Sequence, residues 1–95
     1  MILSILIPVF NEKKTIKQIL ERVNEVKLPN SLKKEITVID DCSNDGTTKI
    51  LKSIKKINFE YIRNSKNLGK GASVRTGIYK SRGDIIIIQD ADLEY

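Results

Sequence analysis

The most informative feature of this 95-residue chain is what it lacks. It contains no histidine and no tryptophan, and it has a single cysteine, Cys42. Without histidine, neither a Ser-His-Asp nor a Cys-His catalytic arrangement can form, and one cysteine makes neither an internal disulfide nor a Cys/His zinc site. Any chemistry must therefore come from carboxylates, lysines, backbone amides or a hard metal ion.

Long hydrophobic runs are also missing. The longest, residues 5–10 and 85–88, fall far short of the roughly 18 residues of a membrane-spanning helix. Apolar residues rather than a basic segment follow Met1, which argues against a secretory signal. We therefore expect a cytoplasmic protein, with no transmembrane segment in this chain.

Short apolar blocks alternate with stretches of helical period. Strands are predicted over residues 2–8, 35–39, 59–62 and 84–89. Helices are predicted over residues 13–26 and 70–82, and between them where Ile50, Leu51, Ile54 and Ile57 recur at helical spacing. Strands joined by crossover helices are parallel, and strands apolar throughout need helices on both faces. The predicted fold class is α/β, a Rossmann-like parallel sheet of about four strands with flanking helices.

Ligands of such sheets bind beyond the carboxyl ends of the strands. In this chain polar and acidic segments follow each predicted strand, at residues 8–12, 40–46, 64–71 and 90–94. The first of them has no glycine, and Gly69-Lys70-Gly71 fits neither the dinucleotide fingerprint nor a P-loop. One edge of the sheet is therefore expected to carry a ligand site of another kind.

Asp90 and Asp92 are the most specific acidic pair at this edge. They are two positions apart at a strand end, which places their Cα atoms roughly 6–7 Å apart, and only the small Ala91 lies between them. Such carboxylates repel unless a cation lies nearby, and oxygen ligands with open positions suit Mg²⁺ or Mn²⁺ bridging to a phosphate. Glu94 can add a third oxygen. The alternative is a solvated acidic turn, but the position after a buried strand favours the metal.

Other residues of this edge have both a structural and a functional interpretation. Asp40 and Asp41 can bind a nucleobase or a ribose, or they can cap the following helix. Asn11 suits an N-cap, and Glu12 suits the start of a helix. Three cations can face a diphosphate or remain solvated, namely Lys66, Lys70 and Arg75. Two aromatic residues are expected to pack against the sheet and a helix, namely Tyr61 and Tyr79.

Four segments of the chain resemble, in order and spacing, the successive motifs of the family 2 glycosyltransferases. They are residues 4–12, 38–47, 67–77 and 84–92, and together they cover nearly the whole chain. The Asp-Ala-Asp-Leu-Glu ending and the Gly-Lys-Gly turn are most similar to the branch of dolichol-phosphate mannosyltransferase and the polyprenyl-phosphate glycosyltransferases. The resemblance implies the N-terminal, nucleotide-sugar-binding part of such an enzyme, the first half of a glycosyltransferase-A type fold.

The resemblance also implies site residues. The segment after the first strand matches the part that contacts the nucleotide base, with Phe10 where the family often has tyrosine. Ile39 and Asp41 match the residues that pack against and hydrogen-bond the base. The donor site implied in this way comprises Pro8, Phe10, Glu12, Ile39, Asp41, Lys70, Asp90, Ala91 and Asp92. The implied metal ligands are Asp90, Asp92 and Glu94. The resemblance assigns no catalytic residue within this chain.

The function implied is inverting transfer from a GDP- or UDP-sugar, assisted by Mg²⁺ or Mn²⁺, with a polyprenyl or dolichyl phosphate as acceptor. Enzymes of the family continue past the Asp-X-Asp motif, so residues 1–95 are expected to be a nucleotide-sugar-binding domain truncated after it. The full-length protein would then act at the cytoplasmic face of the membrane. The last strand would form an exposed apolar edge, which predicts self-association.

Two alternatives compete with the enzyme. One is a non-catalytic nucleotide-sugar-binding module or inactive fragment with the same site. The other is a nucleic-acid-binding domain, suggested by 17 Lys and Arg against 12 Asp and Glu, a net charge of +5. Because aromatic residues do not interleave with these basic residues, and acidic residues occupy the expected ligand edge, we expect no nucleic acid among the partners.

Overall fold

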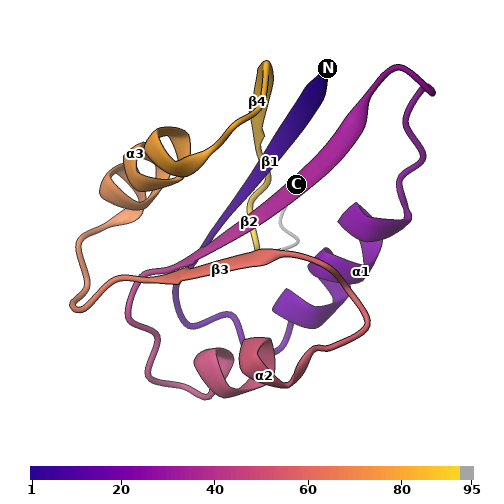
Figure 1. Cartoon of the computed structure of the whole chain (residues 1–95). Helices are drawn as coiled ribbons and strands as arrows, with labels where there is room; N and C mark the ends of the chain where they lie inside the picture. Colours follow the sequence, from indigo (N-terminus) through magenta and orange to yellow (C-terminus); the bar gives the residue numbers. More distant parts are fainter. Residues whose placement is uncertain (93–95) are drawn as a thin grey trace.

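The computed structural model describes residues 1–92. Its strands are β1 (Ile2–Val9), β2 (Lys33–Asp40), β3 (Glu60–Arg63) and β4 (Ile85–Ile88). Its helices are α1 (Ile16–Glu25), α2 (Thr47–Ser53) and α3 (Lys70–Lys80). Strands and helices alternate along the chain (Figure 1), which confirms the predicted α/β class and order of elements.

The four strands form one parallel sheet in the order β3-β2-β1-β4. At its centre, Ile5 of β1 lies opposite Ile36 of β2 on one side and Ile87 of β4 on the other. The chain moves outward from β1 to β3 and then crosses back to place β4 on the other side of β1. In sheets of this kind the ligand crevice lies where the strand order reverses, which here is between the carboxyl ends of β1 and β4.

Helices cover both faces of the sheet, with α1 and α2 on one face and α3 on the other (Figure 1). The predicted apolar stripe of α1 is buried against alternate residues of β1 and β2, in a core that includes Ile16, Leu20, Ile5, Ile7 and Val38. On the opposite face α3 approaches the sheet closely at Gly77. A Cβ there would lie 2.9 Å from Ile39 Cδ1 and 3.0 Å from Leu6 Cδ1, so the helix can pack this closely because residue 77 has no side chain.

Two sequence-based expectations were wrong in detail. The helix predicted to extend to Ile57 ends at Ser53, and Ile54 has an extended backbone with φ −80° and ψ 115°. Ile54 and Ile57 still pack against the core, which explains why their spacing looked helical. Tyr79 was expected to pack, but 86% of it is exposed on α3. Tyr61, by contrast, packs against the core as expected.

The β4 strand forms one edge of the sheet, and its four isoleucines are each between 37% and 48% exposed. The predicted exposed apolar edge is thus present in the structure. Among the described helices, none combines the length and the hydrophobicity needed to cross a membrane.

Thr37, in the middle of β2, is 1% exposed, and its hydroxyl oxygen has no hydrogen-bond partner. A buried hydroxyl without a partner lowers stability, because its interaction with water is lost on folding and is not replaced. We predict that Thr37→Val, which keeps the side-chain shape, raises the free energy of unfolding by about 1 kcal/mol in urea titrations.

The matched control for this prediction is Thr47→Val. Thr47 is equally buried, but its hydroxyl donates to Asp45 and accepts from the Glu12 N–H, so this variant should be less stable than the wild type. A stabilising Thr47→Val, or a destabilising Thr37→Val, would contradict this account.

Candidate functional site

The loops that follow β1 and β2 are joined by hydrogen bonds. The Asn11 N–H donates to Ser43 Oγ at 3.0 Å, and Asn11 Oδ1 accepts the Asn44 N–H at 2.8 Å. The Glu12 N–H donates to Thr47 Oγ1 at 3.0 Å. The expectation that Asn11 is an N-cap was wrong, since Thr15 holds that position of α1. Instead Asn11, with φ 53°, ties two loops together and so holds the segment from Pro8 to Glu12 in place.

Asp40 has a structural role. It is completely buried, and its carboxylate accepts the Ser43 N–H at 2.9 Å, the Thr48 hydroxyl at 2.5 Å and the Tyr61 hydroxyl at 2.7 Å. Burial, and then the hydrogen bond to Asp40, raise the pKa of Tyr61 to about 12. Of the two interpretations of Asp40, the structure therefore favours the one in which it stabilises the loop and the start of α2.

The Asp41 side chain points away from the contacts of Asp40, toward α3, and it organises the loop before that helix. Its Oδ1 accepts the Leu68 N–H at 2.8 Å and the Asn64 side-chain amide at 2.9 Å, and its Oδ2 accepts the Gly69 N–H at 2.8 Å. Gly69 has φ 95°, a conformation that favours glycine. Burial alone would raise the pKa of Asp41, but these three hydrogen bonds outweigh it and the pKa is lowered. Asp41 is therefore a charged acceptor that positions the beginning of α3.

Lys70 is the first residue of α3, and its Nζ forms an ion pair with Asp90 Oδ1. The two side chains are 61% and 56% exposed. An ion pair with this exposure contributes little to stability, so a ligand can replace either partner at low cost. The ion pair also shows that a positive charge is accommodated beside the acidic pair.

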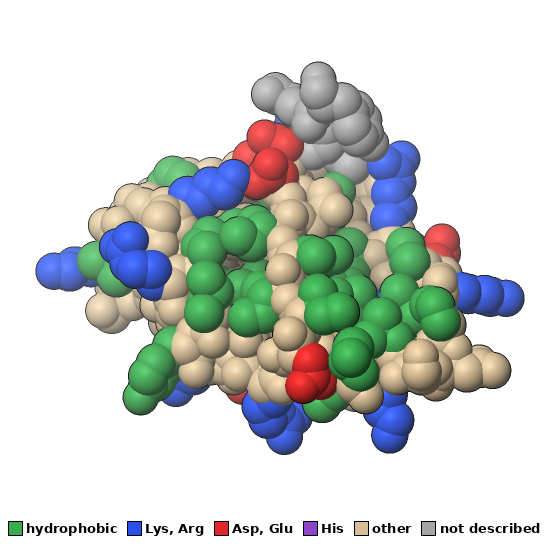
Figure 2. All heavy atoms as spheres, turned by 90° about the horizontal axis from the view of Figure 1, so that it is seen from above, with side chains coloured by type: hydrophobic (Ala, Val, Ile, Leu, Met, Phe, Trp, Pro, Cys, Tyr) green, Lys and Arg blue, Asp and Glu red, His purple; other side chains and the backbone are tan. Residues whose placement is uncertain are grey.

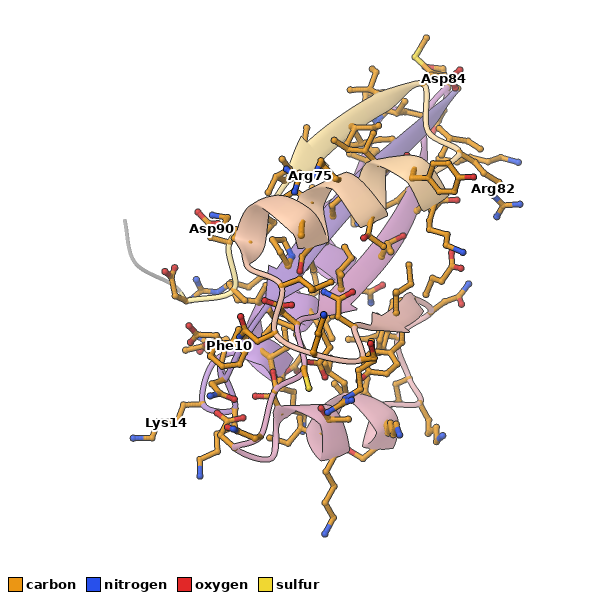
Figure 3. All side chains as sticks on the ribbon, turned by 90° about the vertical axis from the view of Figure 1, so that its left-hand side faces the viewer. Phe10, Lys14, Arg75, Arg82, Asp84 and Asp90 are labelled. Atoms are coloured by element: carbon orange, nitrogen blue, oxygen red, sulfur yellow. The ribbon has the colours of Figure 1, made fainter. Side chains whose placement is uncertain are left out.

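Residues at the carboxyl ends of β1, β2 and β4, together with the first turn of α3, line a cavity of about 180 Å³. It is lined by Pro8, Val9, Phe10, Glu12, Asp41, Lys70, Ser73, Asp90, Ala91 and Asp92. Small-molecule sites commonly measure about 300–1,000 Å³, so this cavity has room for only part of a ligand of that size. Figure 3 shows Phe10 and Asp90 on the same side of the molecule, whereas Arg82 and Asp84 lie near the opposite end of the sheet.

Most of the predicted site residues line this one cavity, but two sets do not. Ile39 is fully buried beneath α3 and does not line it, because the close approach of α3 at Gly77 covers this side chain. Lys66 and Arg75 are exposed and also lie outside the lining. Glu94, an expected metal ligand, lies outside the described residues.

Asp90 and Asp92 are the carboxylates that can hold a metal in this cavity. Within residues 1–92, no three acidic, histidine or cysteine side chains gather closely enough to hold an ion by themselves. Two carboxylates nevertheless suit Mg²⁺ or Mn²⁺, since such ions are commonly held by one or two carboxylates together with substrate phosphates. The two carboxylates therefore fit a metal ion whose remaining ligands include oxygens of a bound phosphate.

Sequence reasoning missed three polar residues that support the site. The Asn64 amide donates to both Asp41 Oδ1 and Ser73 Oγ, the latter at 3.1 Å, and the Thr15 hydroxyl donates to the Ala91 carbonyl at 2.5 Å. Ser73 also lines the cavity. Their types are common on helices and in loops, so no local sequence signal distinguishes them. Only their burial and their distant partners reveal the role.

Four carboxylates with lowered pKa values predict acid sensitivity. Three lie at this edge of the sheet, and the fourth, Glu35, lies near the other end, where it contacts Arg82. The pKa values of Asp40, Asp41 and Asp45 are lowered from 3.8, and that of Glu35 from 4.5, because hydrogen bonds to the carboxylates outweigh the effect of burial, which by itself would raise them. A lowered pKa contributes stability that is present above the unfolded-state value and is lost as the pH falls through the folded-state value. The contribution of these groups to the free energy of unfolding should therefore be constant from pH 7 to about 5 and fall steeply below pH 3.8.

Urea titrations between pH 7 and pH 2 test this prediction. Asp45→Asn removes one of the four groups and should give a shallower loss below pH 3.8 than the wild type. A wild-type free energy of unfolding that stays constant down to pH 2 would show that these carboxylates do not ionise more readily in the folded protein.

Comparison with known proteins places this geometry in a family. The family model "Glycosyl transferase family 2" matches residues 4–95. An undecaprenyl-phosphate 4-deoxy-4-formamido-L-arabinose transferase of Aeromonas hydrophila is 30% identical over 96 residues, which cover 98% of this chain and 29% of that protein. Human dolichyl-phosphate beta-glucosyltransferase is 33% identical over 99 residues, which cover 95% of this chain and 31% of that protein.

Solved structures share the fold. S. aureus TarS 1-349 in complex with UDP-GlcNAc has a TM-score of 0.84 and 26% identity, over 97% of this chain and 27% of that one. The mannosyltransferase PcManGT from Pyrobaculum calidifontis, in complex with GDP-Man and Mn²⁺, has a TM-score of 0.83 and 26% identity, over 95% of this chain and 27% of that one.

The present chain thus spans less than a third of the length of each of these relatives. The family model, however, matches nearly the whole of it, including most of β1, all the other strands and helices, and the residues that line the cavity. The chain therefore belongs to glycosyl transferase family 2.

Proposed function

We propose that residues 1–95 form a nucleotide-sugar-binding domain, which supplies the donor site of an inverting glycosyltransferase. The observation that carries the proposal is the single cavity that brings together Phe10, Asp41, Lys70 and the Asp90–Asp92 segment from four separate parts of the chain. These are an aromatic surface, a hydrogen-bond acceptor, a cation and an acidic pair. A nucleotide sugar offers a complementary set of groups, namely a base, hydroxyl groups and a diphosphate.

Each side chain has a role that its contacts support. Phe10 is 43% exposed, so part of its ring is available to a base. Asp41 Oδ1 already accepts two hydrogen bonds, whereas Oδ2 accepts the Gly69 N–H and has capacity for one more, from a base or a ribose. Lys70 can exchange Asp90 for an anionic oxygen of the diphosphate, since their ion pair is exposed.

Asp90 and Asp92 would hold the divalent ion, with Glu94 as a further candidate ligand outside the described residues. When bound, Mg²⁺ or Mn²⁺ neutralises charge on the diphosphate leaving group. In the transfer, a bond forms between an acceptor oxygen and the anomeric carbon as the bond from that carbon to the diphosphate oxygen breaks on the opposite face, which inverts the configuration. The residues of this chain hold the donor in place for that attack.

The names of the relatives guide the choice of substrates. TarS has been solved with UDP-GlcNAc, and the Pyrobaculum calidifontis enzyme with GDP-Man and Mn²⁺, which supports a UDP- or GDP-sugar donor. Two relatives are named for polyprenyl phosphates, undecaprenyl and dolichyl. We therefore propose a polyprenyl phosphate as acceptor. Because that lipid resides in a membrane, the full-length protein would act at a membrane face, which we propose to be the cytoplasmic one.

Calorimetry tests the donor site. UDP-GlcNAc and GDP-mannose are titrated into the chain with Mn²⁺ and again with EDTA, and we expect measurable binding of at least one donor in Mn²⁺ only. Equal affinity for a donor in Mn²⁺ and in EDTA would rule out metal-dependent binding, and no binding of either donor would count against the donor site itself. Incubating the bound donor with undecaprenyl phosphate then separates a transferase, which forms the glycosylated lipid, from a binding module, which does not.

The exposed β4 edge is proposed to pair with the same strand of a second copy. Exposed hydrophobic side chains gather on one face of the molecule (Figure 2), and the four isoleucines of β4 lie on a strand with a free edge.

We expect the wild-type chain to self-associate in sedimentation experiments at micromolar concentrations. We expect Ile87→Lys to be monomeric, because a lysine on an edge strand opposes strand pairing. Val26→Lys is the control. Val26 is 55% exposed but lies at the end of α1, so this variant should still associate. A monomeric wild type would contradict the proposal.

A further inference from the structure

Thr15 has a hydrogen bond that its position does not explain. It occupies the N-cap of α1, where a threonine oxygen usually accepts an N–H of the first helical turn, but its side chain makes no such bond. Three acceptors surround its hydroxyl. These are the Ala91 carbonyl at 2.5 Å, Glu12 Oε2 at 3.3 Å and the Glu12 carbonyl at 3.5 Å. A hydroxyl has one hydrogen to donate, and the Ala91 carbonyl is the nearest acceptor by a wide margin.

Ala91 is the residue between the two aspartates of the acidic pair, Asp90 and Asp92. Ala91 itself is only 5% exposed and belongs to the core, whereas Asp90 on one side of it is exposed. Among the described residues, the last backbone hydrogen bond that ties this part of the chain to β1 is donated by the Gln89 N–H to the Leu6 carbonyl, at 2.8 Å. Residues 90–92 lie outside any strand. The Thr15 hydroxyl therefore fixes the backbone between the two aspartates just where the regular sheet has ended.

Thr15 is itself well placed to fix another segment. Its N–H donates to the Glu12 carbonyl at 3.1 Å, and the Glu12 N–H donates to Thr47 Oγ1 at the start of α2. Thr15 thus lies in the loop that joins β1 to α1, and this loop is hydrogen-bonded to the first residue of α2, Thr47. Through the hydrogen bond from Thr15 to the Ala91 carbonyl, the acidic pair is held in a fixed position relative to β1, α1 and α2.

We infer that Thr15 is a positioning residue for the Asp90–Asp92 pair, and that its hydroxyl sets the metal affinity of the site without touching the metal. The inference rests on the proposed function, because that function assigns the metal to these two aspartates. Groups that orient metal ligands through a hydrogen bond typically change metal affinity by about 10- to 100-fold when they are removed. The contact here is to the backbone between the ligands, so we expect an effect at the lower end, about tenfold.

The test uses NMR spectra of the ¹⁵N-labelled chain during titration with Mn²⁺ alone. Paramagnetic broadening of the amides of residues 90–92 gives the Mn²⁺ affinity, and amide hydrogen exchange without metal reports how firmly this segment is held. Thr15→Val keeps the branched side chain and removes the donor, and it should weaken Mn²⁺ binding about tenfold and speed exchange at residues 90–92. Thr15→Ser keeps the hydroxyl and should restore both to within about twofold of the wild type.

Thr48→Val is the matched control. The Thr48 hydroxyl donates to Asp40 rather than to Ala91, so this variant loses a comparable hydrogen bond elsewhere at the same edge of the sheet. It should keep the wild-type Mn²⁺ affinity. If Thr15→Val and the wild type bind Mn²⁺ equally, or if Thr48→Val is weakened as much as Thr15→Val, the inference is overturned. If the wild type binds no Mn²⁺, the proposed metal site fails, and amide exchange in Thr15→Val still decides whether Thr15 holds the segment.

Discussion

Replacing Asp92 with asparagine is expected to weaken Mn²⁺-dependent binding of a nucleotide sugar by about 100-fold. The reason is electrostatic, since a neutral amide is a poor ligand for a hard divalent cation and the remaining Asp90 is already paired with Lys70. Calorimetry with UDP-GlcNAc and with GDP-mannose, each with Mn²⁺, measures the loss. The folded state should be kept, because Asp92 lies beyond the end of β4.

Asp90→Asn makes this prediction more specific. It also removes one carboxylate, but it releases Lys70 to interact with the donor diphosphate, so the loss of affinity should be smaller than for Asp92→Asn. The control is Asp84→Asn. Asp84 lies near the opposite end of the sheet (Figure 3), where it accepts the Ile2 N–H, and this variant should bind donor as the wild type does. Equal donor affinities in Asp92→Asn and Asp84→Asn would remove the acidic pair from the site.

Replacing Asp41 with asparagine is expected to lower the free energy of unfolding by about 2–4 kcal/mol. The Asp41 carboxylate accepts hydrogen bonds from the Leu68 N–H, the Gly69 N–H and the Asn64 amide, and it is 4% exposed. An asparagine has one acceptor oxygen, so its own NH₂ group must face at least one of these donors. A buried donor without an acceptor costs about 1–3 kcal/mol, and the charge that strengthened the remaining bonds is lost as well.

Urea unfolding at pH 7 measures this effect, again with Asp84→Asn as the control. Asp84 accepts one backbone N–H at an exposed position, so its replacement should cost well under half as much. Donor affinity should also fall in Asp41→Asn, because Asp41 positions the turn that precedes Lys70. If Asp41→Asn is as stable as Asp84→Asn, the carboxylate does not organise the loop before α3 in the way that the structure indicates.

Much of the fold follows from the sequence alone. The alternation of apolar blocks with helical stretches reflects the different periods of strand and helix, and it predicts the elements in their order. The rule that ligands bind at the carboxyl ends of parallel strands then identifies the cavity-lining segments before any contact is known. Both inferences depend on local spacing, which a single sequence contains.

What each polar residue does could not be predicted in this way, and Asp40 and Asp41 illustrate the reason. They are adjacent and of one type, but the side chains of successive residues at a strand end point to opposite faces. Asp40 therefore contacts Thr48 and Tyr61, while Asp41 contacts the loop before α3. Ile39 was assigned to the site and is instead covered by α3, because the absence of a side chain at Gly77 lets that helix pack closely against the sheet.

The sequence by itself determined the alternating elements, the parallel sheet, the acidic and polar edge and the kinship with a family. The tertiary structure decided which of those polar groups meet. Thr15 and Ala91 are 76 positions apart and belong to unremarkable local patterns, and only the placement of β4 beside β1 brings them into contact. Hydrogen bonds between distant segments depend on how strands are ordered and how closely helices pack, and neither quantity is encoded in local spacing.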